Sequence, residues 1–241
     1  GIAARALDLL IDGLRGGQRQ RGVAHLALTG GSSAAALVAL LRTDERAQRV
    51  DWTGVHVWQG DERFVAADHP DRNWAVAQRE WLAVGDGPGV VAHPVPVDEA
   101  LAGGHDAAWA AARYAHELES WLPVRAAAPS FDVVLLGLGG DGHILSTFPR
   151  TPPIAEERVP VLPVAAPSHI EPHLPRVTLA PYLLRGALGI VVMVPGAGKA
   201  AAVHDVLTGP VDPQRLPAQL ALRPTAVWLL EPTSASTLVA S

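Results

Sequence analysis

Short apolar runs alternate along the chain with longer windows of helical spacing. The runs are rich in Val, Ile and Leu, as in strands that are buried on both faces. In the windows apolar residues recur every three or four positions, for example Ala111, Tyr114 and Leu118. This alternation predicts a mostly parallel α/β sheet flanked by helices. The expected strands are Val23–Leu28, Val55–Trp58, Val90–Val95, Phe131–Leu136, Leu188–Val194 and Ala226–Leu230, and the expected helices are Ala3–Leu14, Ser33–Leu41, Asn73–Leu82, Ala107–Leu122, Gly198–Leu207 and Pro217–Ala221.

One stretch breaks this alternation. Thr151–Pro175 is rich in proline and has few clear periods, which predicts a long surface excursion. Strand and helix patterns resume after it in the same style. We therefore do not interpret this stretch as a linker between domains.

The composition excludes several classes of protein. With 49% hydrophobic and 18% charged residues among 241, the chain has enough apolar surface to bury one large core, which excludes intrinsic disorder. It has no cysteine, so disulfides, thiolate nucleophiles and cysteine metal sites are excluded. The longest strand-like runs are about seven residues, well short of the roughly 20 of a membrane helix. A net charge of −5 argues against a nucleic-acid-binding face. We therefore expect a cytoplasmic protein with neither nucleic acid nor membrane as a partner.

The first candidate site follows the predicted strand that ends at Leu28. Two glycines and two serines lie between this strand and a helical window. Backbone N–H groups and the positive end of a helix dipole bind anions, and glycine lets the backbone approach a phosphate closely. An ordinary helix N-cap with a tight turn has the same composition, so this pattern leaves both interpretations open. The residues are Gly30, Gly31, Ser32 and Ser33.

Three adjacent charges, Asp61, Glu62 and Arg63, follow the strand that ends at Trp58. Ligands of parallel α/β sheets gather at the carboxyl ends of the strands. Charges at such a place are costly unless they face a cleft or pair with each other. Arg63 is suited to hold an oxyanion or a phosphate with two donors. The alternative is a solvated loop with an internal Asp–Arg or Glu–Arg pair.

A glycine-rich turn at residues 137–142 follows the expected strand Phe131–Leu136. Its glycines match the spacing of a dinucleotide-binding fingerprint, but Pro149 ends any helix that would follow, and no acidic residue ends a second strand about 20 residues on. The turn instead places Asp141 and His143 at the carboxyl edge of the sheet. A His beside an Asp suits general acid–base catalysis near neutral pH. A turn His that is hydrogen-bonded for structure remains the alternative.

Two further cations are candidates for binding a phosphate. Lys199 ends a segment that resembles the end of a P-loop, but Met193 takes the place of its first glycine and Ala200 that of its magnesium-binding hydroxyl. We therefore interpret Lys199 as a point charge for a phosphate. Arg176 is a weaker candidate, because arginines are common on protein surfaces.

The spacing of residues argues against a metal centre and against a serine nucleophile elbow. His169 and His173 are four residues apart, but Pro172 interrupts the helix that would align them on a metal ion. Neither H-E-x-x-H nor G-x-S-x-G occurs in the sequence. We predict that the protein uses no metal.

Taken together, these segments resemble the 6-phosphogluconolactonase family. The matching blocks occur in the order and spacing of the family and run from about residue 26 to the segment near Glu231, nearly the whole chain. Each block is common by itself, and their joint occurrence is specific. The blocks are L-T-G-G-S-S, D-W-T-G-V-H-V-W-Q-G-D-E-R-F-V with a following R-N, F-D-V-V-L-L-G-L-G-G-D-G-H, S-T-F-P, R-V-T-L and G-A-G-K-A.

The resemblance implies hydrolysis of 6-phospho-D-glucono-1,5-lactone to 6-phospho-D-gluconate, the second step of the oxidative pentose phosphate pathway, without a cofactor. It implies one modified Rossmann-like domain over residues 1–241, which we expect to be a monomer or a small homo-oligomer. By the same resemblance His143 is the general base for a water molecule, Asp141 orients it, and Arg63 stabilises negative charge or holds the substrate. The implied substrate and phosphate ligands are Gly30, Gly31, Ser32, Ser33, Asp61, Arg176 and Lys199.

The chain departs from the family pattern at a few positions. Ser33 stands where Thr is usual and keeps the hydroxyl, so we expect phosphate binding to be little affected. Ile144, Leu145 and Thr147 follow the His where the family has T-A-S-L, and we expect them to alter the packing behind His143.

Two other functions remain as alternatives. A glucosamine-6-phosphate deaminase or isomerase has a related fold, but its family shows D-E-Y where this chain has Asp61-Glu62-Arg63, and F-N-E-P where it has Thr147-Phe148-Pro149. Such an enzyme would release ammonia from glucosamine 6-phosphate. The second alternative is a sugar-phosphate sensor without catalytic activity.

We expect exhaustive chelation to leave lactone hydrolysis unchanged. So reactive an ester needs positioning, one base and a partner for the oxyanion rather than a metal. The rate before and after dialysis against a chelator measures this. A loss of activity that added metal restores would contradict it.

Overall fold

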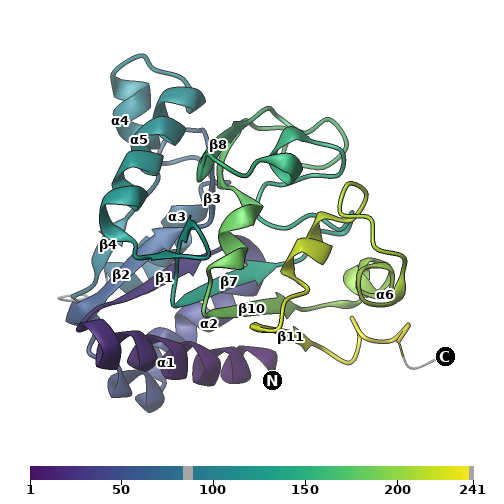
Figure 1. Ribbon diagram of the computed structural model, residues 1–241, viewed down its shortest axis with the longest axis horizontal. Helices are drawn as coiled ribbons and strands as arrows, with labels where there is room; N and C mark the ends of the chain where they lie inside the picture. Colours follow the sequence, from purple (N-terminus) through teal and green to yellow (C-terminus); the bar gives the residue numbers. More distant parts are fainter. Residues whose placement is uncertain (84–88, 239–241) are drawn as a thin grey trace.

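A six-stranded parallel sheet forms the centre of the computed structural model, which describes residues 1–83 and 89–238 (Figure 1). The strand order is β11-β10-β7-β1-β2-β4, and every neighbouring pair is parallel. The predicted mostly parallel α/β fold is therefore confirmed. The strands are β1 (Ala24–Leu28), β2 (Val55–Gln59), β4 (Val91–His93), β7 (Val133–Gly137), β10 (Gly189–Val194) and β11 (Ala226–Leu230).

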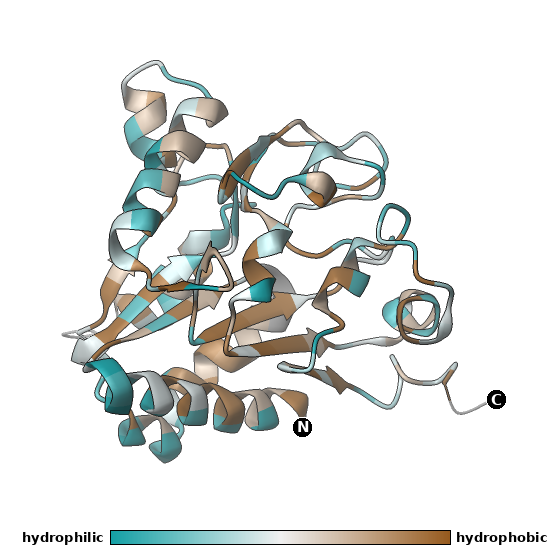
Figure 2. Cartoon of the chain, viewed as in Figure 1, coloured by the Kyte–Doolittle hydropathy of each residue, from teal (hydrophilic) through white to brown (hydrophobic). Residues whose placement is uncertain are grey.

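Helices cover both faces of this sheet. Successive residues of a strand point to opposite faces, so each strand packs against helices on both sides. In β1, Leu26 and Leu28 pack with α1 (Ile2–Arg21) and α2 (Gly31–Thr43), whereas Ala27 packs on the other face with α5 (Ala107–Trp121). Figure 2 shows the sheet as mainly hydrophobic and the outer sides of the helices as mainly hydrophilic. The remaining helices are α3 (Asn73–Ala77), α4 (Val97–Ala102) and α6 (Ala200–Thr208), with the short helical segments η1 (Glu45–Arg49), η2 (Trp52–Gly54), η3 (Gln78–Leu82), η4 (Pro152–Ala155), η5 (Pro181–Arg185), η6 (Ala197–Lys199) and η7 (Pro217–Ala221).

Within the described ranges, no helix has both the length and the apolar character that crossing a membrane requires.

Helix α1 is longer than the pattern predicts. The expected helix ends at Leu14, whereas the glycines at positions 13, 16 and 17 would weaken a helix by themselves. The helix continues to Arg21 because it packs closely on the sheet: a Cβ on Gly13 would lie 2.4 Å from Cγ2 of Val133. Tertiary packing here outweighs local helix propensity.

A second, antiparallel sheet lies over the carboxyl end of the first, and the sequence pattern did not predict it. Its strands are β3 (Asp61–Arg63), β9 (Arg176–Leu179) and β8 (Val161–Val164), in the order β3-β9-β8. Residues 151–175 were expected as a surface excursion. That expectation was wrong in part, because they contain η4 and β8. Pairing of β3 with β9 places Arg63 opposite Arg176. A third, two-stranded ribbon joins β5 (Val124–Arg125) to β6 (Ala128–Pro129).

Three histidines are buried side by side across β1, β2 and β4. His25, His56 and His93 are each at most 5% exposed. Nδ1 of His56 lies 2.9 Å from Nε2 of His93, and Nδ1 of His93 lies 2.5 Å from Oε1 of Glu117. Burial, together with neighbouring His56, Arg21 and His93, lowers the pKa of His25 to about 3. Burial also lowers the pKa of His56.

The free energy of unfolding is expected to fall as the pH is lowered from about 7.5 to 5. Below a pH of about 6.5 the unfolded chain protonates His25, whereas the folded protein does so only near about pH 3. The stability that depends on neutral His25 is therefore complete above about pH 6.5 and decreases by about 2 kcal/mol at pH 5. Denaturant unfolding at the two pH values measures the decrease. In His25→Asn the decrease should be smaller, and an unchanged pH dependence in that variant would contradict the account.

Candidate active site

A pocket of about 270 Å³ lies at the carboxyl ends of β1, β2, β7 and β10. Each of these strands is followed by at least one residue that lines it, and β9 of the second sheet contributes another. Six of the residues proposed from the sequence meet here, although they are spread over most of the chain. They are Gly30, Asp61, Arg63, His143, Arg176 and Lys199.

His143 is held by a turn that depends on glycine. Nδ1 of His143 lies 2.5 Å from Oδ1 of Asp141, and the backbone N–H of His143 donates to the same oxygen at 3.2 Å. A Cβ on Gly139 would lie only 2.0 Å from Nδ1 of His143, so only glycine leaves room for the ring. Gly142 has φ +83°, which glycine adopts without strain. Asp141 does not line the pocket, and it reaches the site through His143.

The hydrogen bonds of Asp141 determine the tautomer of the neutral His143. Burial alone would raise the pKa of Asp141, but hydrogen bonds from His143 and His169 outweigh it and hold this pKa well below its ordinary value. An ionised carboxylate only accepts hydrogen bonds. Nδ1 of His143 therefore carries the proton, and Nε2 presents a lone pair, as a general base requires.

Two arginines stand side by side at the pocket. Arg63 and Arg176 are register partners of β3 and β9. Nη1 of Arg63 donates to the carbonyl oxygen of Asp71 at 2.6 Å, and Nη2 of Arg176 donates to that of Pro172 at 3.1 Å. The buried Nε atoms of both arginines lack hydrogen-bond partners among the described residues. Burial, and next the charge of Arg63, lowers the pKa of Arg176. Two positive charges on paired strands favour the binding of an anion beside them.

Lys199 brings a third cation to the pocket from the segment after β10. It ends η6, which precedes α6, so its ammonium group stands beside the strand ends rather than within a long helix. The segment that ends in Lys199 is a short helical connection at the start of α6. Three positive side chains around one small pocket create a site for an anionic ligand.

Asp61 is buried and anchored on both oxygens. Its Oδ2 accepts a hydrogen bond from Oγ of Ser146 at 2.6 Å, and its Oδ1 accepts one from Nδ2 of Asn73 at 3.3 Å. Asn73 also lines the pocket, and a Cβ on Gly30 would lie 2.1 Å from its Oδ1. The sequence showed Asn73 only as the start of a helix and did not identify it as a site residue.

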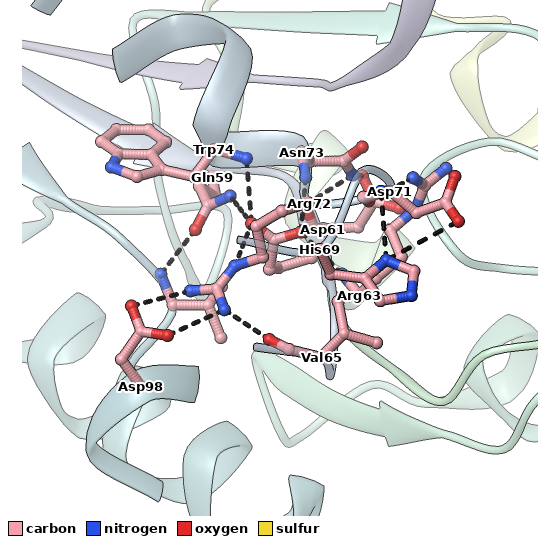
Figure 3. Close-up of polar contacts among 12 residues, drawn as sticks. Gln59, Asp61, Arg63, Val65, His69, Asp71, Arg72, Asn73, Trp74 and Asp98 are labelled. Carbon is pink, nitrogen blue, oxygen red and sulfur yellow. Dashed lines mark hydrogen bonds and ion pairs between the residues drawn. The ribbon is translucent and has the colours of Figure 1, made fainter. Parts of the chain in front are cut away.

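Glu62, between Asp61 and Arg63, has a structural role. It is fully buried, and its Oε2 pairs with Nε of Arg72 at 3.1 Å. Nη1 of Arg72 also pairs with Oδ1 of Asp98 at 2.9 Å. The alternative of an internal ion pair therefore holds for Glu62, although its partner is Arg72 and not Arg63. Figure 3 shows how these contacts join β3 to the start of α3. The donors to the Glu62 carboxylate are Nε2 of Gln59, Nε of Arg72 and the backbone N–H groups of Arg63, Asn73 and Trp74.

The other predicted phosphate ligands lie at the start of α2. Gly30 is the N-cap, and Gly31, Ser32 and Ser33 form the first turn. The side chains of these three residues are outside the described part of the chain, so their roles stay predictions.

The segment expected as a surface excursion also reaches the pocket, which its pattern did not indicate. Ile170 and Glu171 line the pocket. His169 donates to Asp141, with Nε2 of His169 at 2.9 Å from Oδ2. From the sequence, His169 was considered only as a metal ligand together with His173, and Pro172 argued against that role. In residues 1–83 and 89–238, no group of three or more His, Asp or Glu side chains is arranged to hold a metal ion.

Comparison with known proteins gives one consistent family. The family model described as glucosamine-6-phosphate isomerases/6-phosphogluconolactonase matches residues 1–230. The 6-phosphogluconolactonase of Synechocystis sp. is 35% identical in an alignment that covers 88% of this chain and 83% of that protein. The 6-phosphogluconolactonase of Streptomyces coelicolor is 35% identical in an alignment that covers 98% of this chain and 88% of that protein. The solved structure of 6-phosphogluconolactonase from Trypanosoma brucei has a TM-score of 0.84 at 27% identity, covering 98% of this chain and 94% of that one.

Gly139→Ala is expected to break the bond between His143 and Asp141, because its Cβ would occupy the position of the imidazole. The ¹⁵N NMR spectrum of the His143 ring should show a proton on Nδ1 in the unchanged protein and lose it in the variant. Gly140→Ala is the matched control, since the nearest described atom to its Cβ is the carbonyl oxygen of Gly198 at 4.0 Å. Retention of the Nδ1 proton in both variants would contradict this account.

Proposed function

The chain belongs to the family of glucosamine-6-phosphate isomerases and 6-phosphogluconolactonases, and we propose that it hydrolyses 6-phospho-D-glucono-1,5-lactone to 6-phospho-D-gluconate. The observation that carries this proposal is the pair of His143 and Asp141 at a pocket that three cations share. A base for water and positive charge for a phosphate and an oxyanion are what this reaction needs.

In the proposed reaction, His143 takes a proton from a water molecule through Nε2. The water oxygen attacks the lactone carbonyl, and the oxyanion that forms is stabilised by the guanidinium of Arg63. Asp141 stabilises the imidazolium, as the carboxylate of a catalytic triad does. The imidazolium then gives its proton to the ring oxygen as the acyl–oxygen bond breaks. Water is thereby added across that bond, and no covalent intermediate with the protein is formed.

The phosphate is proposed to bind at Lys199 and the start of α2, with Arg176 assisting. The N-terminus of α2 offers backbone N–H groups and the positive end of a 13-residue helix. Arg176 supports this role because its buried Nε has no described partner. Asp61 is proposed to accept from a sugar hydroxyl, since its carboxylate lines the pocket and is held in place by Ser146.

The two alternatives have less support. The family model covers both isomerases and lactonases, but the relatives described above are lactonases at 35% identity. A sensor without catalytic activity needs the cations but not an imidazole that is oriented by a carboxylate at 2.5 Å. The deaminase and the sensor are therefore not favoured.

We propose further that residues 1–241 act as one domain, in the cytoplasm, as a monomer or a small homo-oligomer. The pocket supports a single domain, because residues from Gly30 to Lys199 of one chain build it.

The decay of freshly prepared lactone, corrected for its spontaneous hydrolysis, tests the activity. His143→Ala is expected to lower kcat by about 10²–10⁴-fold, the usual contribution of general base catalysis. Lys199→Ala should mainly raise KM, because it removes a charge that binds substrate and transition state alike. Circular dichroism and thermal unfolding check that both variants fold. An unchanged kcat in His143→Ala would contradict the role of this base, and ammonia release from glucosamine 6-phosphate without lactone hydrolysis would contradict the function.

A further inference from the structure

Two histidines share the carboxylate of Asp141. Oδ1 accepts from Nδ1 of His143 at 2.5 Å, and Oδ2 accepts from Nε2 of His169 at 2.9 Å. His169 comes from the segment that precedes β9, and its side chain is 47% exposed, compared with 19% for both His143 and Asp141. The catalytic pair thus extends to a third residue that reaches solvent.

We propose that His169 is a positioning residue that acts through Asp141: it takes up part of the carboxylate charge, so that His143 is a weaker base than beside a free carboxylate. This inference rests on the proposed lactonase function. His169 donates to Asp141 and is not itself assigned to the substrate.

The direction of the effect follows from electrostatics. An ionised carboxylate favours the protonated form of a neighbouring imidazole. A hydrogen bond to the second carboxylate oxygen draws charge away from the first and reduces this effect. Without His169, His143 should keep its proton to higher pH, and less of the neutral base should be present near neutrality.

Phe148 packs against both histidines. The centroid of its ring lies 4.7 Å from that of His143 and 5.8 Å from that of His169, the latter edge-on. The guanidinium of Arg176 lies 5.2 Å from the centroid of Phe148. His169 is thus half-exposed, with one side of its ring in contact with Phe148.

Other charged side chains also line the pocket around His143, and the test must leave them unchanged. Arg63, Arg176 and Lys199 line the pocket and oppose protonation of His143, whereas Asp61 and Glu171 line it and favour protonation. None of these side chains forms a described hydrogen bond with Asp141. Replacing His169 therefore changes the environment of Asp141 and leaves these pocket charges in place.

A matched set of variants separates positioning from a purely structural role. His169→Phe keeps a ring but removes the donor, whereas His169→Gln keeps an amide N–H near the position of Nε2. His204→Phe is the control, because His204 is 44% exposed, close to the 47% of His169, and contacts Asp205, and neither His204 nor Asp205 lines the pocket. All three are compared with the unchanged protein in the dependence of kcat on pH.

In His169→Phe the acid limb of the pH profile of kcat is expected to move to higher pH by about 0.5–1 unit. This is a fraction of the pKa shift of about 1–3 units that a full neighbouring charge produces. Activity near pH 6 should then fall about three- to tenfold, while the plateau at high pH changes little. His169→Gln should reverse most of the shift, and His204→Phe should leave the acid limb in place. A uniform loss of kcat without a shift, or an equal shift in His169→Gln, would overturn the proposal.

Titration of the His143 ring by ¹⁵N NMR without substrate distinguishes failure of this inference from failure of the proposed function. If the protein does not hydrolyse the lactone, the function fails, but the midpoint of the His143 titration should still rise in His169→Phe. If it hydrolyses the lactone and this midpoint does not move, the function stands and the role of His169 is wrong.

Discussion

The site depends on one buried carboxylate that takes no part in the proposed chemistry. Glu62 is fully buried and accepts five hydrogen bonds, which tie together the end of β2, the strand β3 and the start of α3. Removing one partner of such a buried pair costs about 3–5 kcal/mol, because the other charge is left without compensation. Arg63 and Asp61 flank Glu62 in β3, so the position of both in the pocket follows from this anchor.

The network around Glu62 also divides the arginines into two groups. Some pair with carboxylates and stabilise the fold, and others remain available to bind a ligand. Arg72 is satisfied by Glu62 and Asp98 and stays out of the pocket. Arg63 and Arg176 are held beside each other by strand pairing, with incomplete hydrogen bonding among the described residues. Keeping two cations together without a bound anion costs free energy, and binding an anionic substrate recovers it.

The sequence predicted the parallel sheet well, because strands buried on both faces leave continuous apolar runs such as those of β7 and β10. It also predicted which turns would meet, because residues that follow parallel strands gather at one edge. The second sheet was not predicted, since β8 lies in a proline-rich stretch and its pairing with β9 leaves no local signal. The role of Asn73 and the bond from His169 to Asp141 were missed for the same reason: each depends on a contact between distant segments.

A crystal structure with bound 6-phospho-D-gluconate tests the central claim most directly. The account predicts that the product carboxylate lies within hydrogen-bond distance of Nε2 of His143, with Arg63 beside it, and that the phosphate contacts Lys199 and the start of α2. A carboxylate bound away from His143, or a phosphate bound at His143 itself, would contradict it.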